Sequence, residues 1–168
     1  APDRNRLDIE DIFDIGANYS QSFSGVDVTL SGRYGTADSN VPGIDDPEVW
    51  AIGAQFGYQG FTIGGHYGEN DNGLPGDVGD QEGYSIGVTY DLAGPWAVEA
   101  LTFQGELDNG PGVKDNDYEA YRVGAARDLG PGVTWEVYYI HSETNNATEP
   151  GNPEVDGDLV GTGISLSF

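Results

Sequence analysis

Apolar and polar residues alternate along most of this chain with a period of two. Between Trp50 and Tyr58, for example, apolar residues hold the even positions, and alanine, glycine and glutamine hold the odd ones. A period of two is the side-chain period of a β-strand. Together with turn-forming residues between the runs, the pattern predicts nine strands: Asp11–Gln21, Val26–Gly35, Val49–Tyr58, Phe61–Tyr67, Gly83–Asp91, Trp96–Gly105, Tyr118–Asp128, Val133–His141 and Asp158–Phe168.

The predicted strand Trp96–Gly105 breaks the alternation. Trp96, Val98 and Ala100 share one face, but Leu101 and Phe103 fall on the other. A β-bulge places an extra residue in one strand and so shifts the alternation beyond it. We therefore expect a bulge in this strand.

The connections between the predicted strands alternate in length. The short ones are Ser22–Gly25, Gln59–Gly60, Leu92–Pro95 and Gly130–Gly132, and the long ones are Thr36–Glu48, Gly68–Glu82, Glu106–Asp117 and Ser142–Gly157. Tight turns on one rim and longer loops on the other are typical of antiparallel barrels in the bacterial outer membrane. The fold class predicted is all-β, an antiparallel transmembrane β-barrel. Every short turn should lie on one rim and every long loop on the other.

Aromatic residues gather where the predicted strands end, as the two membrane interfaces favour. The apolar face should then point to lipid and the other face inward. We expect lipid-facing side chains at Val28, Ile52, Phe56, Ile63, Ile86, Val88, Val137 and Ile164, and inward ones at Thr29, Gln55, Thr62 and Thr89. A soluble β-sandwich or barrel with an aromatic core is the alternative, but it does not require loop lengths to alternate.

Composition narrows the function classes. The chain has no Cys, which excludes a disulfide scaffold and a thiolate metal site, and no apolar run reaches the roughly 20 residues of a transmembrane helix. Lys and Arg total 6 against 29 Asp and Glu, for a formal net charge of -23. Such a chain repels nucleic acid, which we do not expect as a partner, and attracts cations.

Three segments resemble strand–turn–strand units of Gram-negative general diffusion porins, especially the alphaproteobacterial, Rhodobacter-like branch. They read DIFDIGANYSQSFSGVDVTLSGRYG, WAIGAQFGYQGFTIGGHYGEN and YSIGVTYDLAGPWAVEALTFQGE, and the ending GISLSF is similar to the last strand of these porins. The resemblance implies a homotrimeric, 16-stranded barrel that passes small hydrophilic solutes passively. It also implies that Phe168 is the signal to the barrel-assembly machinery.

The chain is roughly half as long as those porins, and nine strands is an odd number. Bacterial single-chain barrels have an even count, with both ends in the periplasm. We therefore interpret residues 1–168 as one barrel segment, the C-terminal part of a porin, with residues 1–10 in an external loop. The alternative is an eight-stranded barrel that starts near Val26 and has a structural or adhesion role. Such small interiors are filled by side chains, whereas inward glycines such as Gly53, Gly124 and Gly161 fill nothing.

Little in the sequence indicates catalysis, since His66 and His141 are its only histidines and no nucleophile–base–orienter set is legible. We expect no enzyme and no cofactor. ENDNG and DNDYE place oxygen ligands at alternate positions, which suits Ca²⁺, so Glu69, Asp71, Asp115 and Asp117 are candidate ligands. Neither segment completes an EF-hand loop, and a solvated acidic loop is the alternative.

The inward face is the site that matters for a pore. Its charged residues are expected to be Asp27, Arg33, Glu99, Arg122 and Glu136. Arg33 and Arg122 either belong to a basic wall or are hydrated charges with no selective role. The predicted function is passive diffusion of small hydrophilic solutes or ions, with cations favoured. Outer-membrane lipid and lipopolysaccharide are the expected surroundings.

Overall fold

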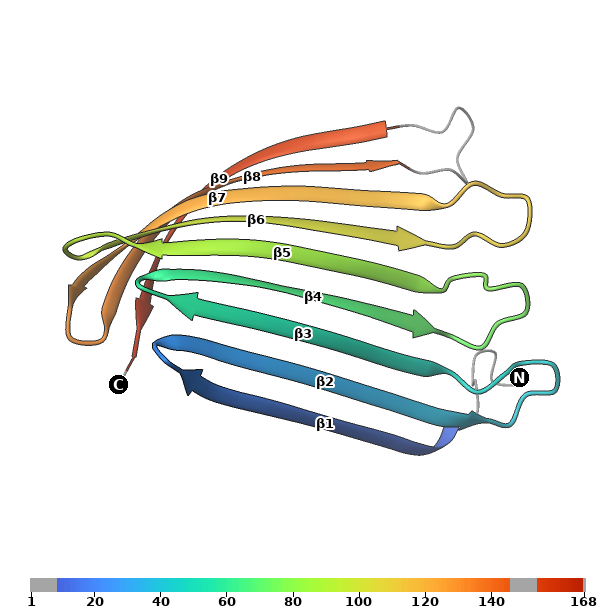
Figure 1. Cartoon of the computed structure of the whole chain (residues 1–168). Coiled ribbons are helices and arrows are strands. Elements are labelled where there is room, and N and C mark those ends of the chain that lie inside the picture. The colour runs from blue at the N-terminus through green and yellow to red at the C-terminus, as the bar shows by residue number, and fades with distance from the viewer. Residues whose placement is uncertain (1–8, 146–153, 168) are drawn as a thin grey trace.

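The computed structural model describes residues 9–145 and 154–167, and these form one antiparallel sheet (Figure 1). Its nine strands follow each other in chain order, each beside the next. They are β1 (Ile9–Phe23), β2 (Val26–Ser39), β3 (Glu48–Tyr58), β4 (Phe61–Asp71), β5 (Gln81–Asp91), β6 (Trp96–Leu107), β7 (Asn116–Gly130), β8 (Val133–Asn145) and β9 (Glu154–Leu166). Within the described ranges, no helix is long and apolar enough to cross a membrane.

All nine predicted strands are present, and most extend further toward the long connections than predicted. β2 continues beyond Gly35 to Ser39, and β4 continues beyond Tyr67 to Asp71. The apolar alternation ends before the hydrogen-bonded ladder does, because polar residues pair as well through their backbones. For the same reason residues 9 and 10, expected in an external loop, belong to β1. Residues 1–8 lie outside the described part of the chain.

The two tightest turns have the backbone conformation of a two-residue hairpin, with glycine in the second position. Ser24 and Gly25 have φ of 51° and 85°, and Gln59 and Gly60 have φ of 48° and 85°. Two successive positive φ angles define the type I′ turn, whose twist matches that of the flanking strands. These turns fix the registers of β1 with β2 and of β3 with β4.

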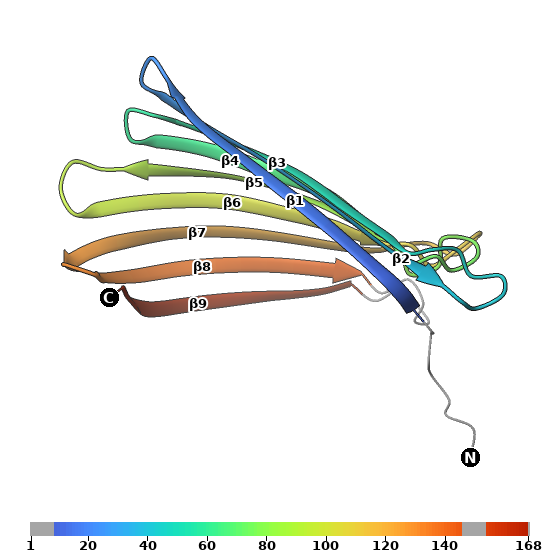
Figure 2. The same ribbon diagram turned by 90° about the horizontal axis from the view of Figure 1, so that it is seen from below.

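The short turns lie on one rim and the long connections that the structure describes in full, residues 40–47, 72–80 and 108–115, lie on the other, as predicted (Figures 1 and 2). On the long-loop rim, Asp45 N donates to Gly73 O at 2.8 Å, and Gly79 N donates to Asp108 O at 2.7 Å. On the short-turn rim, Asp91 N donates to Gly60 O at 2.9 Å. Neighbouring connections on each rim are therefore hydrogen-bonded to one another.

The cross-strand register separates the side chains into two faces. Directly paired residues share a face, and successive residues alternate between faces. On the apolar face, one continuous row runs through Val28, Phe56, Ile63 and Val88. The opposite face carries the paired Thr62 and Thr89. The eight residues expected on the apolar face all lie on it, and the four expected on the opposite, polar face lie there.

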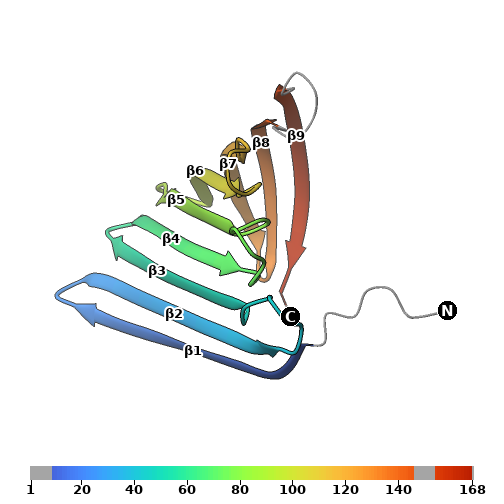
Figure 3. The same ribbon diagram turned by 90° about the vertical axis from the view of Figure 1, so that its right-hand side faces the viewer.

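The sheet is a single curved layer, and no second layer packs on either face within the described residues (Figure 3). Among the described residues, Ala37 is the only apolar residue that is buried, while Ile52 and Ile86 are 58% and 52% exposed. A soluble β-sandwich would cover one face of each sheet. This sheet instead leaves its apolar face open along its full width.

The predicted bulge in the sixth strand is wrong. β6 pairs without a register shift from Trp96 to Leu107, and the irregularities lie in β1 and near Gly130 in β7. Leu101 and Phe103 break the alternation because they stand on the polar face, paired with Arg122 and Ala120.

β1 and β9 are the edges of the sheet, each with one neighbouring strand. The alternative of an eight-stranded barrel starting near Val26 does not match this order, because β2 pairs with β1 as well as with β3.

Candidate functional site

The polar face carries all five charged residues expected to line a pore. The register places Asp27 and Arg33 on this face of β2, Glu99 on β6, Arg122 on β7 and Glu136 on β8. Glu99, Arg122 and Glu136 form one group. Arg33 forms a second with Asp14, and Asp27 lies apart from both, in contact with Ser22.

Arg122 lies between two carboxylates. Its Nε is 2.8 Å from Oε1 of Glu99, and its Nη2 is 3.2 Å from Oε2 of Glu136. The guanidinium also stands over the ring of Tyr138, 4.3 Å from the ring centre. The side chains of Arg122 and Glu99 are 28% and 32% exposed, and that of Glu136 is 44% exposed. The group thus has a formal charge of -1, presented mainly by Glu136.

Glycines on neighbouring strands provide the space for this group. A Cβ on Gly124 would lie 2.7 Å from Oε1 of Glu99, and one on Gly161 would overlap the ring of Tyr138. Because glycine has no side chain, a large side chain from the neighbouring strand can lie flat over it on the sheet. The inward glycines add no side chain of their own, and the side chains of adjacent strands lie over them at these positions.

The second group is centred on Arg33, which pairs with Asp14 of β1. Arg33 Nε and Nη2 donate to Oδ2 of Asp14 at 2.8 and 2.6 Å. Asp27 accepts a hydrogen bond from Ser22. Neither arginine is thus an isolated basic group. Carboxylates outnumber arginines on the polar face of the described strands: Asp14, Asp27, Asp91, Glu99, Asp128 and Glu136 against Arg33 and Arg122.

A serine–histidine contact also lies on the polar face. Ser85 Oγ is 2.9 Å from Nδ1 of His66, and the two residues pair across β4 and β5. Among the described residues no hydrogen bond joins His66 to a carboxylate, so the third member of a hydrolytic triad is not provided there. The other histidine, His141, contacts Asp158 at 2.9 Å on the apolar face.

Two bands of aromatic rings cross the apolar face. Near the short turns, Phe61 stacks on Tyr90 with ring centres 4.0 Å apart. Near the long loops, Trp50 and Tyr67 are 5.3 Å apart. Rings of this kind favour the boundary between hydrocarbon and water, so the bands delimit the part of the face suited to lipid.

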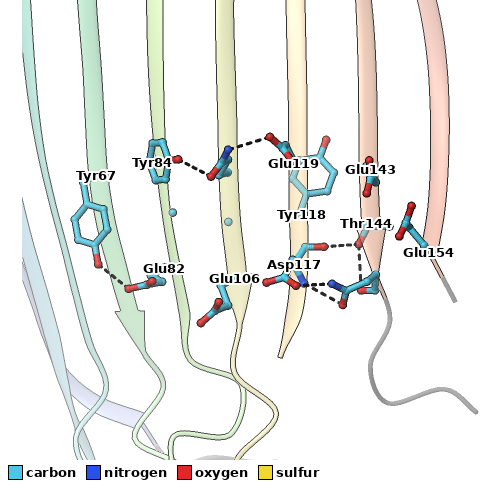
Figure 4. Close-up of a pocket in the computed structure, with 14 residues that line it drawn as sticks. Tyr67, Glu82, Tyr84, Glu106, Asp117, Tyr118, Glu119, Glu143, Thr144 and Glu154 are labelled. Atoms are coloured by element: carbon cyan, nitrogen blue, oxygen red, sulfur yellow. Dashed lines mark hydrogen bonds between the residues drawn. The ribbon is translucent and has the colours of Figure 1, made fainter. Parts of the chain in front are cut away.

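Beyond the second band, the apolar face ends in a cluster of acidic residues around a hollow of about 450 Å³ (Figure 4). Tyr67 donates to Glu82 at 2.7 Å, and Gln104 Nε2 donates to Glu119 at 2.9 Å. The carboxylates that line the hollow are Glu82, Glu106, Asp117, Glu119, Glu143 and Glu154. The alternation of apolar and polar residues does not predict this cluster, because the apolar face becomes polar toward the strand ends.

The four candidate calcium ligands do not converge. Glu69 and Asp71 end β4, whereas Asp115 and Asp117 flank the start of β7, with β5 and β6 between. Glu69 accepts from Trp50 Nε1 at 3.1 Å, and Asp71 accepts from Gly73 N at 2.7 Å. No group of three or more acidic or histidine side chains suited to a metal ion occurs in the described ranges. Phe168, the candidate assembly signal, lies outside those ranges.

The chain is similar to known proteins in sequence pattern and in fold. A family model for Gram-negative porins matches residues 2–147. No curated protein sequence matches the chain. Among solved structures, OmpT (in-vitro folded), an outer membrane protein of Vibrio cholerae, shares the fold with a TM-score of 0.62 and 13% sequence identity. The match covers 92% of this chain and 55% of OmpT, so the chain spans about half the length of that structure.

Proposed function

The chain belongs to the Gram-negative porins and lies in the outer membrane, and on this premise we propose that its sheet forms part of the wall of a water-filled pore. The apolar face contacts lipid and the polar face lines the pore. Small hydrophilic solutes and ions diffuse through it passively, so the function needs neither a reaction nor a cofactor.

The division of one uncovered sheet into two faces carries this proposal. A row such as Val28, Phe56, Ile63 and Val88 stands opposite hydroxyl, amide and charged groups with no protein layer over either side. Lipid on one side and water on the other satisfy both faces at once. The excess of carboxylates on the polar face favours cations over anions.

The edges of the sheet support a larger barrel. β1 and β9 each have one neighbour, and unpaired strand edges are costly in hydrocarbon. We propose that further strands close the barrel between them, as in the 16-stranded porins of the alphaproteobacterial branch, with this chain as the C-terminal portion. An intact mass of the native protein about twice that of these 168 residues is expected. A mass equal to that of the 168 residues would contradict this part.

The partners we propose follow from the same placement. Lipid and lipopolysaccharide surround the apolar face, and Phe168 at the end of the last strand is read by the barrel-assembly machinery. Three copies associate into a trimer, as in the porins that the sequence resembles. Chemical cross-linking of the detergent-solubilised native protein should then give a ladder that ends at three subunits.

Conductance across a planar lipid bilayer tests the central proposal. Native protein purified from the outer membrane should insert and raise the current of a KCl solution in discrete steps. Heat-denatured protein is the control and should give no steps. Folded protein that reaches the bilayer without any conductance would rule out a pore.

A further inference from the structure

The polar face includes a short row of apolar side chains. Leu101, Ile140 and Leu159 occupy one cross-strand row with Arg122, in the order Leu101, Arg122, Ile140, Leu159 from β6 to β9. The same face of β2–β5 instead carries Thr29, Gln55, Thr62, His66, Ser85 and Thr89. The apolar row is therefore a local feature of β6, β8 and β9.

The row is open, whereas a neighbouring aromatic residue on the same face is packed. Phe103 lies over Gly83 and Gly105, and its ring is 5.7 Å from that of Tyr118. None of the three row residues is buried, and Leu159 is 50% exposed. Apolar side chains that line water gain by contact with apolar groups of a solute.

Negative charge lies near the row, and Tyr138 stands between Glu136 and Ile140 on β8. On the same face, Glu99 is two residues from Leu101, and Glu136 is four residues from Ile140 on β8. Both carboxylates contact Arg122, whose charge they together exceed. A solute anion meets an arginine that is already neutralised, while a cation meets the more exposed Glu136.

We propose that this part of the wall is a binding station for amphiphilic organic cations, whose ammonium group lies near Glu136 and whose apolar part lies along Leu101, Ile140 and Leu159. Tyr138, fixed under Arg122 and over Gly161, holds the guanidinium away from the row. The inference rests on the proposed function, since it requires the polar face to line the pore. It adds the class of solute that the wall retains.

Block of the K⁺ current by three small probes in planar bilayers tests the station. Hexylammonium carries both features, methylammonium carries only the charge, and hexanoate carries the alkyl chain with the wrong charge. The two ammonium ions share a narrow cross-section, so steric exclusion does not separate them. Hexylammonium should reach half-block at a concentration roughly tenfold lower than methylammonium, since each methylene group placed on an apolar surface adds affinity. Hexanoate should not block.

Two variants locate the effect in the native porin. Leu101→Ser with Ile140→Ser should abolish most of the difference between the ammonium probes. Glu136→Gln should raise the half-block concentration of both ammonium ions. Because this substitution is nearly isosteric, it should fold, and it provides a test even if the serine variant does not fold. Thr29→Ser and Thr89→Ser on the same face are controls and should change nothing. Equal block by hexylammonium and methylammonium, or unchanged block in both variants, would overturn the station, as would a further segment of the protein covering the row. Absence of any K⁺ current would instead overturn the pore itself.

Discussion

Ile86 and Thr89 lie three residues apart on β5 but on opposite faces, which makes them a matched pair for testing the face assignment. Ile86→Lys places a charge on the face proposed to contact lipid and should destabilise the folded protein by about 2–4 kcal/mol near the bilayer midplane. Thr89→Lys points into water and should cost little. Reversible urea unfolding in lipid vesicles measures both. A neutral Ile86→Lys beside a destabilising Thr89→Lys would reverse the two faces.

Gly161 illustrates why a single glycine can matter in this wall. A Cβ there would overlap the Tyr138 ring, so Gly161→Ala should cost about 1–3 kcal/mol, as overpacking usually does. Gly157 lies on the same face of the same strand, where a Cβ would meet nothing within 4 Å, and Gly157→Ala should be nearly neutral. Adding Tyr138→Ala should remove the cost at Gly161, which a double-mutant cycle of unfolding free energies would show. Equal costs at both glycines would mean that Tyr138 is not the cause.

The members of the charged groups can be predicted from the sequence, but their partners cannot. Alternation alone places Arg33, Glu99 and Arg122 on the polar face. Their pairing depends on cross-strand register, and the four-residue turn before β6 and the irregularity at Gly130 leave that register open in the sequence. For this reason the alternation does not identify Tyr138, which lies under the guanidinium of Arg122.

At the scale of the strand, the period of two predicts all nine strands. It gives a wrong prediction in β6, where apolar residues occur on both faces. It predicts a bulge in β6 because Leu101 and Phe103 fall out of step, yet the ladder of β6 is regular. A break in alternation has two physical causes, a shifted backbone or an apolar side chain on the water-facing side, and sequence does not separate them. The second cause applies here and creates the apolar row beside Arg122.

The two rims can be distinguished in whole cells by single cysteines introduced into these 168 residues, which contain no Cys, with the unsubstituted protein as the control. Val113 in the connection before β7 and Leu92 in the turn before β6 are 46% and 41% exposed, so cysteines there are equally reactive on opposite rims. A maleimide coupled to a polyethylene glycol chain too large to pass through a porin should label Val113→Cys on intact cells and Leu92→Cys only after lysis. Labelling of Leu92→Cys alone on intact cells would mean that the long loops face the periplasm.

At the scale of the whole molecule, the net charge of -23 includes two populations of carboxylates that can act on ions in the proposed pore. Some lie on the long connections, such as Asp45 and Asp77, and others lie on the polar face, such as Glu136. Exposed charges are screened within about 8 Å at physiological ionic strength and about 3 Å at 1 M salt. The partly buried wall group around Arg122 is screened less. The two populations should therefore differ in how their effect on ions depends on salt.

Reversal potentials across a planar bilayer under a KCl gradient measure that difference. The native pore should prefer K⁺ over Cl⁻, and the preference should weaken as the salt concentration rises, because the loop carboxylates are screened first. Asp45→Asn with Asp77→Asn should lower the preference at low salt only. Glu136→Gln should lower it at both low and high salt, since it leaves Glu99 and Arg122 as a neutral pair. A preference for Cl⁻ at low salt would show that the arginines dominate the wall, and a preference unmoved by salt would show that the loops contribute nothing.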